Sequence, residues 1–392
     1  MGTGVPDGWD SGRGTLTPPR TPGWLIGELL LKTVATFKIE YQQILAPDGK
    51  PRGELPGFAK DAAELVRMYR TMVLVRTFDT KAINLQRTGK LGTYASCLGH
   101  EAAHVGIGAA MRPEDVFAPM YREYGTQLWR GVRMSEILLY WGGDERGNNF
   151  SGPAHDFPWC VPIATQCLHA AGSALAMSIR GERRCAVTVV GDGGTSEGAF
   201  YEAINFAGVA RLPLVTVVVN NGWAISVPLA LQTAAETLAQ KGIAAGMASL
   251  QVDGNDVIAV RQAVATALER GREGGGPTLI EALTYRLSDH TTADDARRYR
   301  PKEEVEQAWT VEPLARLRTY LLSVGAWSDE QEQALLAECQ QQVDSEVQRY
   351  TDTPPPPPES MFDYMYATLP ETLVEQREIC IAFSGSGGHG HG

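Results

Sequence analysis

The sequence predicts an α/β fold in which a parallel sheet is flanked by helices, with a helical extension at the C-terminal side. Two β-branched runs, residues 185–190 and 214–219, have the length and composition of buried strands. Helical periodicity occupies 196–210 between them and 164–179 before them. Strands that alternate with helices of this length indicate a parallel sheet covered on both faces.

Further elements are expected on both sides of this core. Before it we predict, in order, a short strand at 35–41 and helices at 60–88, 100–111 and 127–140. After it we predict a helix at 257–270 and a strand at 278–285. Residues 142–162 have no period and many turn formers, so they are predicted to be a long loop, which is often functional inside a compact domain.

The chain is expected to divide into five segments. Residues 1–34, rich in Gly, Pro and Thr, are predicted to be a disordered lead, and residues 35–300 to form the α/β domain. Residues 301–353 are helical and charged. A proline-rich segment and an amphipathic stretch at 361–379, suited to contact another subunit, make up residues 354–380, and 381–392 are predicted to be a flexible tail.

Composition excludes several classes of function. The 35 Lys and Arg against 46 Asp and Glu give a net charge of −11, which disfavours binding to nucleic acids and anionic membranes. The first apolar run, residues 24–31, is too short to span a bilayer, and no signal peptide is evident, so a cytoplasmic location is expected. The six cysteines include no CxxC pair and are expected to be reduced thiols.

The most informative residues follow the two predicted core strands. Asp192 comes directly after the first strand and Asn221 after the second, 29 positions later (221 − 192). Ligands of open α/β sheets bind beyond the carboxyl ends of the strands, and one strand–helix–strand unit places two such ends side by side. An aspartate oxygen, an asparagine amide oxygen and the backbone carbonyl of Trp223 are suitable ligands for Mg²⁺.

A diphosphate would fit at the same place. Gly193 and Gly194 allow the backbone to approach phosphate oxygens closely, and the following helix directs free N–H groups and its positive dipole end toward them. Glu197, in the first turn of that helix, is expected to cap it and is given no catalytic role. Gly-Asp-Gly and Asn-Asn-Gly are each ordinary turn sequences, but the two together, one helix apart, are much more specific.

These motifs resemble the thiamine diphosphate fingerprint, and their surroundings resemble the alpha subunit of the decarboxylating component of 2-oxo acid dehydrogenase complexes. The resemblance covers about residues 35 to 380 and is closest to bacterial pyruvate dehydrogenase alpha subunits, with branched-chain alpha subunits next. The other segments that carry it are residues 120–123, 160–166, 252–257, 285–286 and 290–295. The fold that it implies is the diphosphate-binding type of the thiamine diphosphate-binding fold.

The resemblance also implies roles for individual residues. Tyr121 and Arg122 would contact the cofactor, the latter as a fixed cation at the diphosphate, and Val161 and Ile163 would line it. His290 would face the reactive carbon and assist transfer to the acceptor, because histidine exchanges protons near neutral pH. The alternative for His290 is an exposed loop histidine without a catalytic role. The charged residues at 294–298 either form ion pairs that order this loop or are a solvated run of charges.

Two positions depart from the family pattern. Pro162, Thr165 and Gln166 match a structural K⁺ site of some relatives, but Cys160 stands where a serine ligand is usual, which puts that ion in doubt. Val219 stands where branched-chain relatives often have an arginine that reaches the diphosphate. This difference weakens the branched-chain interpretation and leaves more of the phosphate charge to Arg122 and Mg²⁺.

The activity implied by the resemblance is oxidative decarboxylation of pyruvate, with transfer of the acetyl group to a lipoyl group on the acyltransferase core. The resemblance implies that the carboxylate that activates the cofactor comes from a beta subunit in an α₂β₂ assembly, so the isolated chain is expected to be inactive. The alternatives are the same chemistry on branched-chain 2-oxo acids or acetoin, and a non-catalytic assembly subunit. An NAD-binding protein is disfavoured because no G-x-G-x-x-G turn follows a strand.

Overall fold

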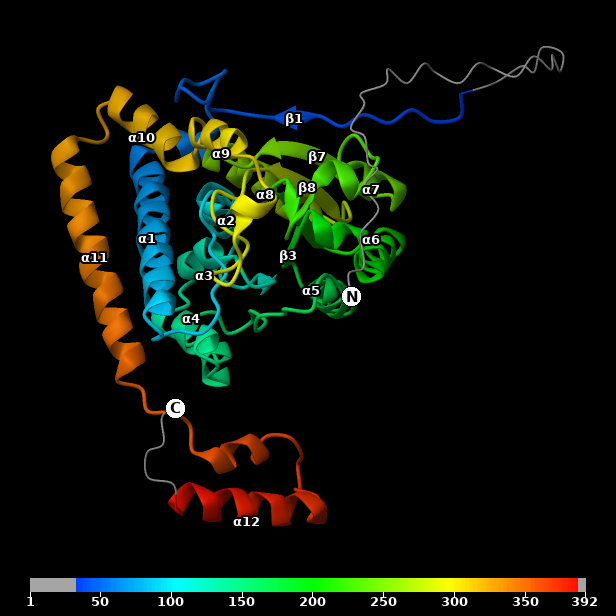
Figure 1. Cartoon of the computed structure of the whole chain (residues 1–392). Helices are drawn as coiled ribbons and strands as arrows, with labels where there is room; N and C mark the ends of the chain where they lie inside the picture. The colour runs from blue at the N-terminus through cyan, green and yellow to red at the C-terminus, as the bar shows by residue number, and fades with distance from the viewer. Residues whose placement is uncertain (1–32, 387–392) are drawn as a thin grey trace, which may run out of the picture. The chain divides into compact units, whose positions relative to one another are not determined.

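The computed structural model describes residues 33–386, drawn in colour in Figure 1. Most of the predicted disordered lead, residues 1–32, and the end of the predicted tail, residues 387–392, lie outside the described part. Contacts divide the chain into a unit of residues 1–38 and a unit of residues 39–392. All elements of secondary structure described below belong to the second unit.

The centre of the second unit is a six-stranded sheet in which all neighbouring strands are parallel. Its order is β1-β7-β8-β4-β3-β2. The strands are β1 (Tyr41–Gln42), β2 (Val116–Ala118), β3 (Ala186–Gly191), β4 (Leu214–Asn220), β7 (Ala248–Asp253) and β8 (Thr278–Leu283). The sheet confirms the predicted α/β class, and β3 and β4 are neighbours as expected for one strand–helix–strand unit.

The central strands bury alternate residues against helices on opposite faces of the sheet (Figure 1). Val190 and Val218 pack on one face against α5 (Thr165–Arg180) and α6 (Gly198–Ala210). Val189 and Val217 pack on the other face against α2 (Glu101–Ala110) and α8 (Val257–Arg272). Burial on both faces explains why these strands are continuously β-branched rather than alternating with polar residues.

A third cluster of apolar residues lies beside the sheet and is built around α1 (Ala62–Arg87). Besides residues of α2 and α8, the helices that contribute to it are α3 (Tyr124–Arg130), α4 (Met134–Trp141), α10 (Pro313–Ser323) and α11 (Asp329–Thr351). Tyr69 of α1 and Trp327 meet edge to face with ring centroids 5.6 Å apart. The segment predicted as a helical extension therefore shares its core with the N-terminal helices.

Several element boundaries differ from the prediction. The strand expected at 35–41 is only Tyr41–Gln42, because residues 33–40 form no ladder. The helix expected at 127–140 is two helices, α3 and α4, separated at Gly131, whose φ of 98° is left-handed and ends α3. The helix expected at 196–210 begins at Gly198, after the 3₁₀ turn η3 (Gly193–Ser196). Strands β2 and β7 were not predicted, since both are short or half-polar runs.

The remaining elements are smaller or lie near the C-terminus. They are η1 (Gly57–Lys60), η2 (Glu145–Asn148), the hairpin β5 (Trp223–Ala224) and β6 (Val227–Pro228), η4 (Leu229–Leu231), α7 (Gln240–Ala244), η5 (Ala296–Arg298), α9 (Lys302–Trp309), η6 (Pro358–Phe362) and α12 (Glu371–Ser386). The amphipathic stretch expected at 361–379 is a 3₁₀ turn followed by α12, and α12 continues into the predicted flexible tail. The exposed apolar residues of α12, Val374, Ile379, Ile381 and Phe383, do not form one stripe, so the prediction that this stretch is amphipathic was wrong. Within residues 33–386, no helix has the length and apolar character needed to cross a bilayer.

Candidate functional site

A cavity of about 250 Å³ opens where β3, β4 and β8 end. All of the sequence-predicted cofactor and metal residues line it except Val161, which is 46% exposed and lies outside. The residues that line it are Met120, Tyr121, Arg122, Ile163, Gly191, Asp192, Gly193, Gly194, Glu197, Asn221, Trp223, Ala224, Ile225, Arg286 and His290. Residues from segments up to 170 positions apart (290 − 120) thus share one small space.

Asp192 is buried at the tip of β3, with 2% of its surface exposed. Its Oδ2 accepts a hydrogen bond from Gln232 Nε2 at 2.8 Å. Burial raises the pKa of Asp192, whereas the hydrogen bond from Gln232, the backbone N–H groups of Asp192 and Asn221, and the charge of Arg286 act to lower it. A buried carboxylate of this kind is favoured in its ionised form once a cation binds beside it.

Asn221 and Trp223 follow the tip of β4. The Oδ1 of Asn221 accepts from the backbone N–H of Trp223 at 3.1 Å, which fixes the turn. The carbonyl of Trp223 accepts from Arg286 Nη1 at 3.2 Å, and its indole N–H donates to Glu304 Oε1 at 2.8 Å. Each carbonyl-type oxygen has a second lone pair, so both oxygens keep capacity for a further ligand.

The two glycines after Asp192 are required by close packing. A Cβ at Gly193 would lie 2.5 Å from the Cβ of Ala224, and one at Gly194 would lie 2.5 Å from Val190 Cγ2. Both glycines belong to η3, and the backbone of this turn forms part of the cavity wall. The close approach, rather than an unusual φ angle, explains why neither position has a side chain.

Two arginines converge on His290. Arg122 donates through Nη2 to the carbonyl of His290 at 2.8 Å, and through Nη1 to the carbonyl of Ser96. The Nδ1 of His290 lies 3.3 Å from Arg122 Nη2 and 3.4 Å from Arg286 Nη1. Since a guanidinium can only donate, Nδ1 must accept, and the neutral imidazole carries its proton on Nε2.

The pKa of His290 is lowered to about 4, first by burial and then by the charges of Arg122 and Arg286, while Asp294 acts in the opposite direction. The side chain is therefore a neutral hydrogen-bond donor at neutral pH. The ordinary histidine pKa expected from the sequence does not hold for His290, because both arginines reach His290 only in the folded chain. An anion that pairs with the arginines would move the pKa of His290 back upward.

Arg286 is a site residue that belongs to a segment carrying the family resemblance but was given no role from the sequence. It is 1% exposed and also donates through Nη2 to the carbonyl of Ile225 at 2.8 Å and to the hydroxyl of Tyr299 at 2.9 Å. Burial lowers its pKa from a high ordinary value. Arg286 comes shortly after β8, so the rule that placed Asp192 and Asn221 beyond strand ends would also have indicated it.

The loop that carries His290 is ordered mainly by hydrogen bonds to the carboxylate of Asp294 rather than by an ion pair. Asp294 Oδ2 accepts from the backbone N–H of His290 at 2.9 Å and from the hydroxyl of Tyr299. Asp295 pairs with Arg297 at 2.7 Å, but Arg297 is 89% exposed in its side chain, so this pair is solvated. Of the two alternatives for the charges at 294–298, Asp294 orders the loop and the Asp295 pair belongs to the surface.

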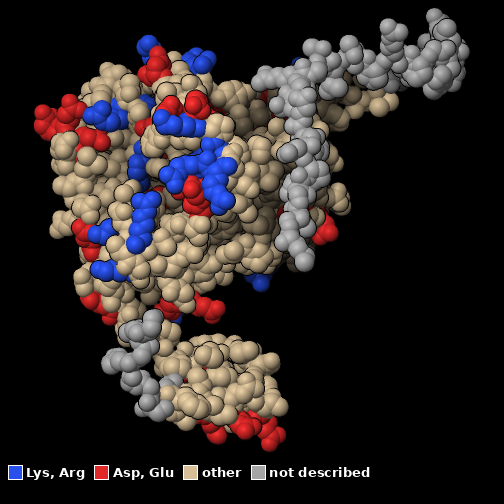
Figure 2. All heavy atoms as spheres, in the orientation of Figure 1, with Lys and Arg blue, Asp and Glu red and all other residues tan. Residues whose placement is uncertain are grey.

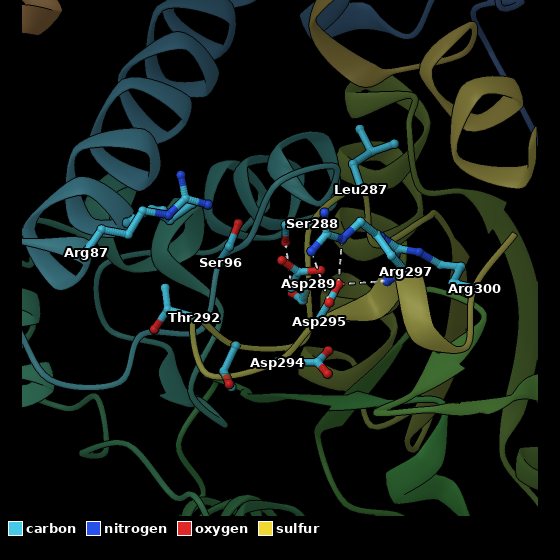
Figure 3. A pocket seen from close by; sticks show the side chains of 12 residues that line it. Arg87, Ser96, Leu287, Ser288, Asp289, Thr292, Asp294, Asp295, Arg297 and Arg300 are labelled. Carbon is cyan, nitrogen blue, oxygen red and sulfur yellow. Dashed lines mark hydrogen bonds and ion pairs between the residues drawn. The ribbon is translucent and has the colours of Figure 1, made fainter. Parts of the chain in front are cut away.

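The same loop borders a second cavity of about 570 Å³, which lies against the end of α1. Figure 3 shows Arg87 of α1 and Ser96 on one side, with Asp289 and Arg300 of the loop on the other. Chain neighbours of His290 line this second cavity while His290 lines the first. On the face around α9 and this loop, Figure 2 shows Lys and Arg side chains gathered with Asp and Glu among them, so the local charge is mixed.

The residues of the proposed K⁺ site are only partly arranged for a cation. Gln166 is buried and donates through Nε2 to the carbonyl of Val189 at 2.7 Å, while its Oε1 has no hydrogen-bond partner among residues 33–386. The carbonyl of Pro162 accepts from the Thr165 N–H at 3.2 Å, and the thiol of Cys160 lies 3.8 Å from it. Glu197 occupies the N-cap position of α6, as expected, but its side chain makes no capping hydrogen bond within the described residues.

Known proteins of one family are similar to this chain over most of its length. The family described as "Dehydrogenase E1 component" matches residues 69–359. The chain is 43% identical over 342 residues to the 3-methyl-2-oxobutanoate dehydrogenase subunit alpha of Mycobacterium tuberculosis, covering 87% of this chain and 93% of that protein. It is 42% identical to the pyruvate dehydrogenase E1 component subunit alpha of Acholeplasma laidlawii (80% and 92% covered) and 38% identical to that of Staphylococcus epidermidis (87% and 93% covered). The chain therefore belongs to the dehydrogenase E1 component family, which implies dependence on thiamine diphosphate.

Proposed function

We propose that this chain is the alpha subunit of a pyruvate dehydrogenase-type oxidoreductase that works with thiamine diphosphate and Mg²⁺. The single observation that supports this most strongly is the cavity at the strand ends, which combines the carboxylates of Asp192 and Glu197, the amide oxygen of Asn221, a glycine turn and two guanidiniums. In the reaction, pyruvate loses CO₂ while a lipoyl disulfide is reduced and receives the acetyl group as a thioester. Thiamine diphosphate, when bound, supplies the electron sink for the loss of CO₂.

The residues present fit the metal and the diphosphate. Asp192, the amide oxygen of Asn221 and the carbonyl of Trp223 would hold Mg²⁺, which prefers oxygen ligands. Arg122 and Arg286 would offset the remaining phosphate charge, and the backbone of Gly193 and Gly194 leaves room for the phosphate oxygens. Arg286 supplies a second cation in a site where Val219 replaces the arginine of branched-chain relatives.

His290 would act as a neutral donor beside the reacting atoms. Its Nδ1 is held by the two arginines, so its Nε2–H is the group available to the substrate or to the incoming acceptor. Asp294 fixes the backbone on which His290 stands. We assign transfer to the acceptor, rather than decarboxylation, as the step that depends on this donor.

Tyr121 and Ile163 would contact the cofactor through their side chains. Tyr121 lies 5.3 Å from the guanidinium carbon of Arg122, measured to the ring centroid, which keeps the arginine over its face. Val161 lies outside the cavity in this chain alone. We propose that it reaches the cofactor, or covers it, only when a beta subunit closes the site.

The partners proposed are a beta subunit in an α₂β₂ assembly, the lipoyl domain of an acyltransferase core and the 2-oxo acid itself. The proline-rich segment at 354–380 would contact another subunit, since its exposed side chains include Met361, Tyr364 and Met365. A cytoplasmic location is part of the proposal. A weak K⁺ site is proposed at Gln166, whose buried Oε1 has no hydrogen-bond partner in the described part of the chain.

A specific observation favours a second substrate. The Mycobacterium tuberculosis relative named for 3-methyl-2-oxobutanoate is as similar to this chain as the pyruvate relatives are. The deciding experiment measures CO₂ release by the chain assembled with its beta subunit, using pyruvate and 3-methyl-2-oxobutanoate at equal concentrations. A higher kcat/KM for pyruvate supports the proposal. A higher kcat/KM for 3-methyl-2-oxobutanoate would show that the branched acid, and not pyruvate, is the preferred substrate.

A second experiment tests the cofactor site. In the assembled complex, Asp192→Ala is expected to abolish binding of thiamine diphosphate in the presence of Mg²⁺, measured by calorimetry, while the melting temperature stays close to that of the parent. Asp48→Ala, at an aspartate that is 55% exposed in its side chain and outside the cavity, serves as the control. Unchanged cofactor affinity in Asp192→Ala would remove this residue from the metal site.

A further inference from the structure

Lys241, on the short helix α7, is a lysine in a buried position, where its charged form is disfavoured. It is 8% exposed, and burial lowers its pKa while the charge of Glu281 raises it. Its ammonium donates to two oxygens of one residue, the carbonyl and the Oγ1 of Thr195, both at 2.8 Å. The Nζ also lies 5.3 Å from the ring centroid of Tyr201. Removing an ammonium from water is costly, so its position calls for a function.

The ammonium acts on the turn that carries the metal residue. Thr195 is fully buried in η3, and its Oγ1 donates to the carbonyl of Asp192 at 2.7 Å. An ammonium can only donate, so Thr195 Oγ1 accepts a hydrogen bond from Lys241. The single hydroxyl proton of Thr195 is then the one that it donates to the carbonyl of Asp192. Lys241 therefore donates to Thr195, and Thr195 donates to the carbonyl of Asp192, so the chain of hydrogen bonds ends on the backbone that leads into the glycine turn.

The other strand end is tied to the same helix. Glu281 of β8 is 1% exposed and accepts from the side chain of Asn220 at 2.8 Å and from the backbone N–H of Ala239 at 3.0 Å. Ala239 is the residue before α7, and Asn220 precedes Asn221 at the tip of β4. One buried carboxylate thus fixes both the start of the helix that presents Lys241 and the end of the strand that presents Asn221.

We propose that Lys241 is a positioning residue for the metal and diphosphate. It holds the Gly193–Ser196 turn in the position in which Asp192 and Asn221 can bind the same ion. The inference rests on the proposed function, because it concerns the same site. Lys241 touches neither the metal nor the reacting atoms. Groups that orient a metal ligand from behind typically change metal affinity or activity by about 10-fold to 100-fold when removed.

The test uses the complex of the full chain with its beta subunit and measures the dissociation constant of thiamine diphosphate at fixed Mg²⁺, together with the melting temperature without cofactor. Lys241→Met, which keeps the length of the side chain and removes its donors, is expected to weaken cofactor binding by about 10-fold or more. Lys302→Met, at a lysine whose side chain is 83% exposed, is the matched control and is expected to bind like the parent. A purely structural role would lower the melting temperature and leave the dissociation constant unchanged.

A second pair of variants covers the case in which Lys241→Met does not fold. Thr195→Val removes the bridging hydroxyl with little change of shape, and Thr195→Ser keeps it. Thr195→Val is expected to weaken cofactor binding by about 10-fold, and Thr195→Ser to restore it. Equal affinity in Val and Ser variants, or parent-like affinity in a folded Lys241→Met, overturns the inference. Failure of the parent complex itself to bind thiamine diphosphate would instead refute the proposed function.

Discussion

Adding a methyl group at Gly194 tests whether the position of the glycine turn sets the geometry of the site. The new Cβ would lie 2.5 Å from Val190 Cγ2 and 3.1 Å from Ile163 Cγ2, whereas ordinary contact begins at 3.4 Å. The turn and the strand beneath it must therefore separate by about 0.9 Å (3.4 − 2.5). Both neighbours are branched side chains in or beside the wall of the cavity.

Two consequences of this displacement can be measured. Overpacking in a filled core costs about 1–3 kcal/mol, so Gly194→Ala should lower the free energy of unfolding by that amount. A misplacement of about 1 Å near a reacting centre can lower the rate about 100-fold, so kcat/KM for the 2-oxo acid should fall by a similar factor. Denaturant unfolding of the chain and steady-state assays of the assembled complex give the two values.

Gly198→Ala is the matched control. A Cβ at Gly198, the first residue of α6, meets nothing within 4 Å, and the position is helical. This variant should gain about 0.4–1 kcal/mol, because alanine restricts the unfolded chain. If Gly194→Ala matched the parent in both stability and activity, the argument that close packing fixes this turn would be wrong.

Three further predictions follow from buried charges and ligands. His104 is 1% exposed and has its pKa lowered to about 3 by burial and Arg122, so below its ordinary pKa of about 6.5 the unfolded chain takes up a proton that the folded chain does not. The stability of the parent relative to His104→Phe should then fall as the pH drops from 6.5 toward 3, by up to about 1.36 kcal/mol per pH unit; a pH-independent difference would contradict this. Arg130→Met should lower the free energy of unfolding by about 3–5 kcal/mol, because it leaves the carboxylate of Asp156, 2.6 Å from the guanidinium and 1% exposed, buried without its charge partner, whereas Lys302→Met should change little. Replacing NaCl with KCl should raise the melting temperature more in Cys160→Ser than in the parent, because the serine hydroxyl restores the usual K⁺ ligand. An equal rise in both proteins would exclude position 160 from a K⁺ site.

Much of the fold could be predicted because it depends on local patterns. The runs at 185–190 and 214–219 are buried on both faces, so their composition alone indicated central parallel strands. β2 and β7 were missed because a three-residue strand and a half-polar strand carry no comparable pattern. The break at Gly131 shows the same limit, since periodicity continues across a turn that one left-handed residue creates.

The sequence by itself determined that Asp192, Gly193, Gly194 and Asn221 share one edge of the sheet. This followed because parallel strands present their carboxyl ends together. Only the tertiary structure decided the state of His290, whose partner Arg122 is 168 positions away, and the exclusion of Val161 from the cavity. Burial and charge fields depend on distances between remote segments, and those distances are fixed by packing rather than by spacing along the chain.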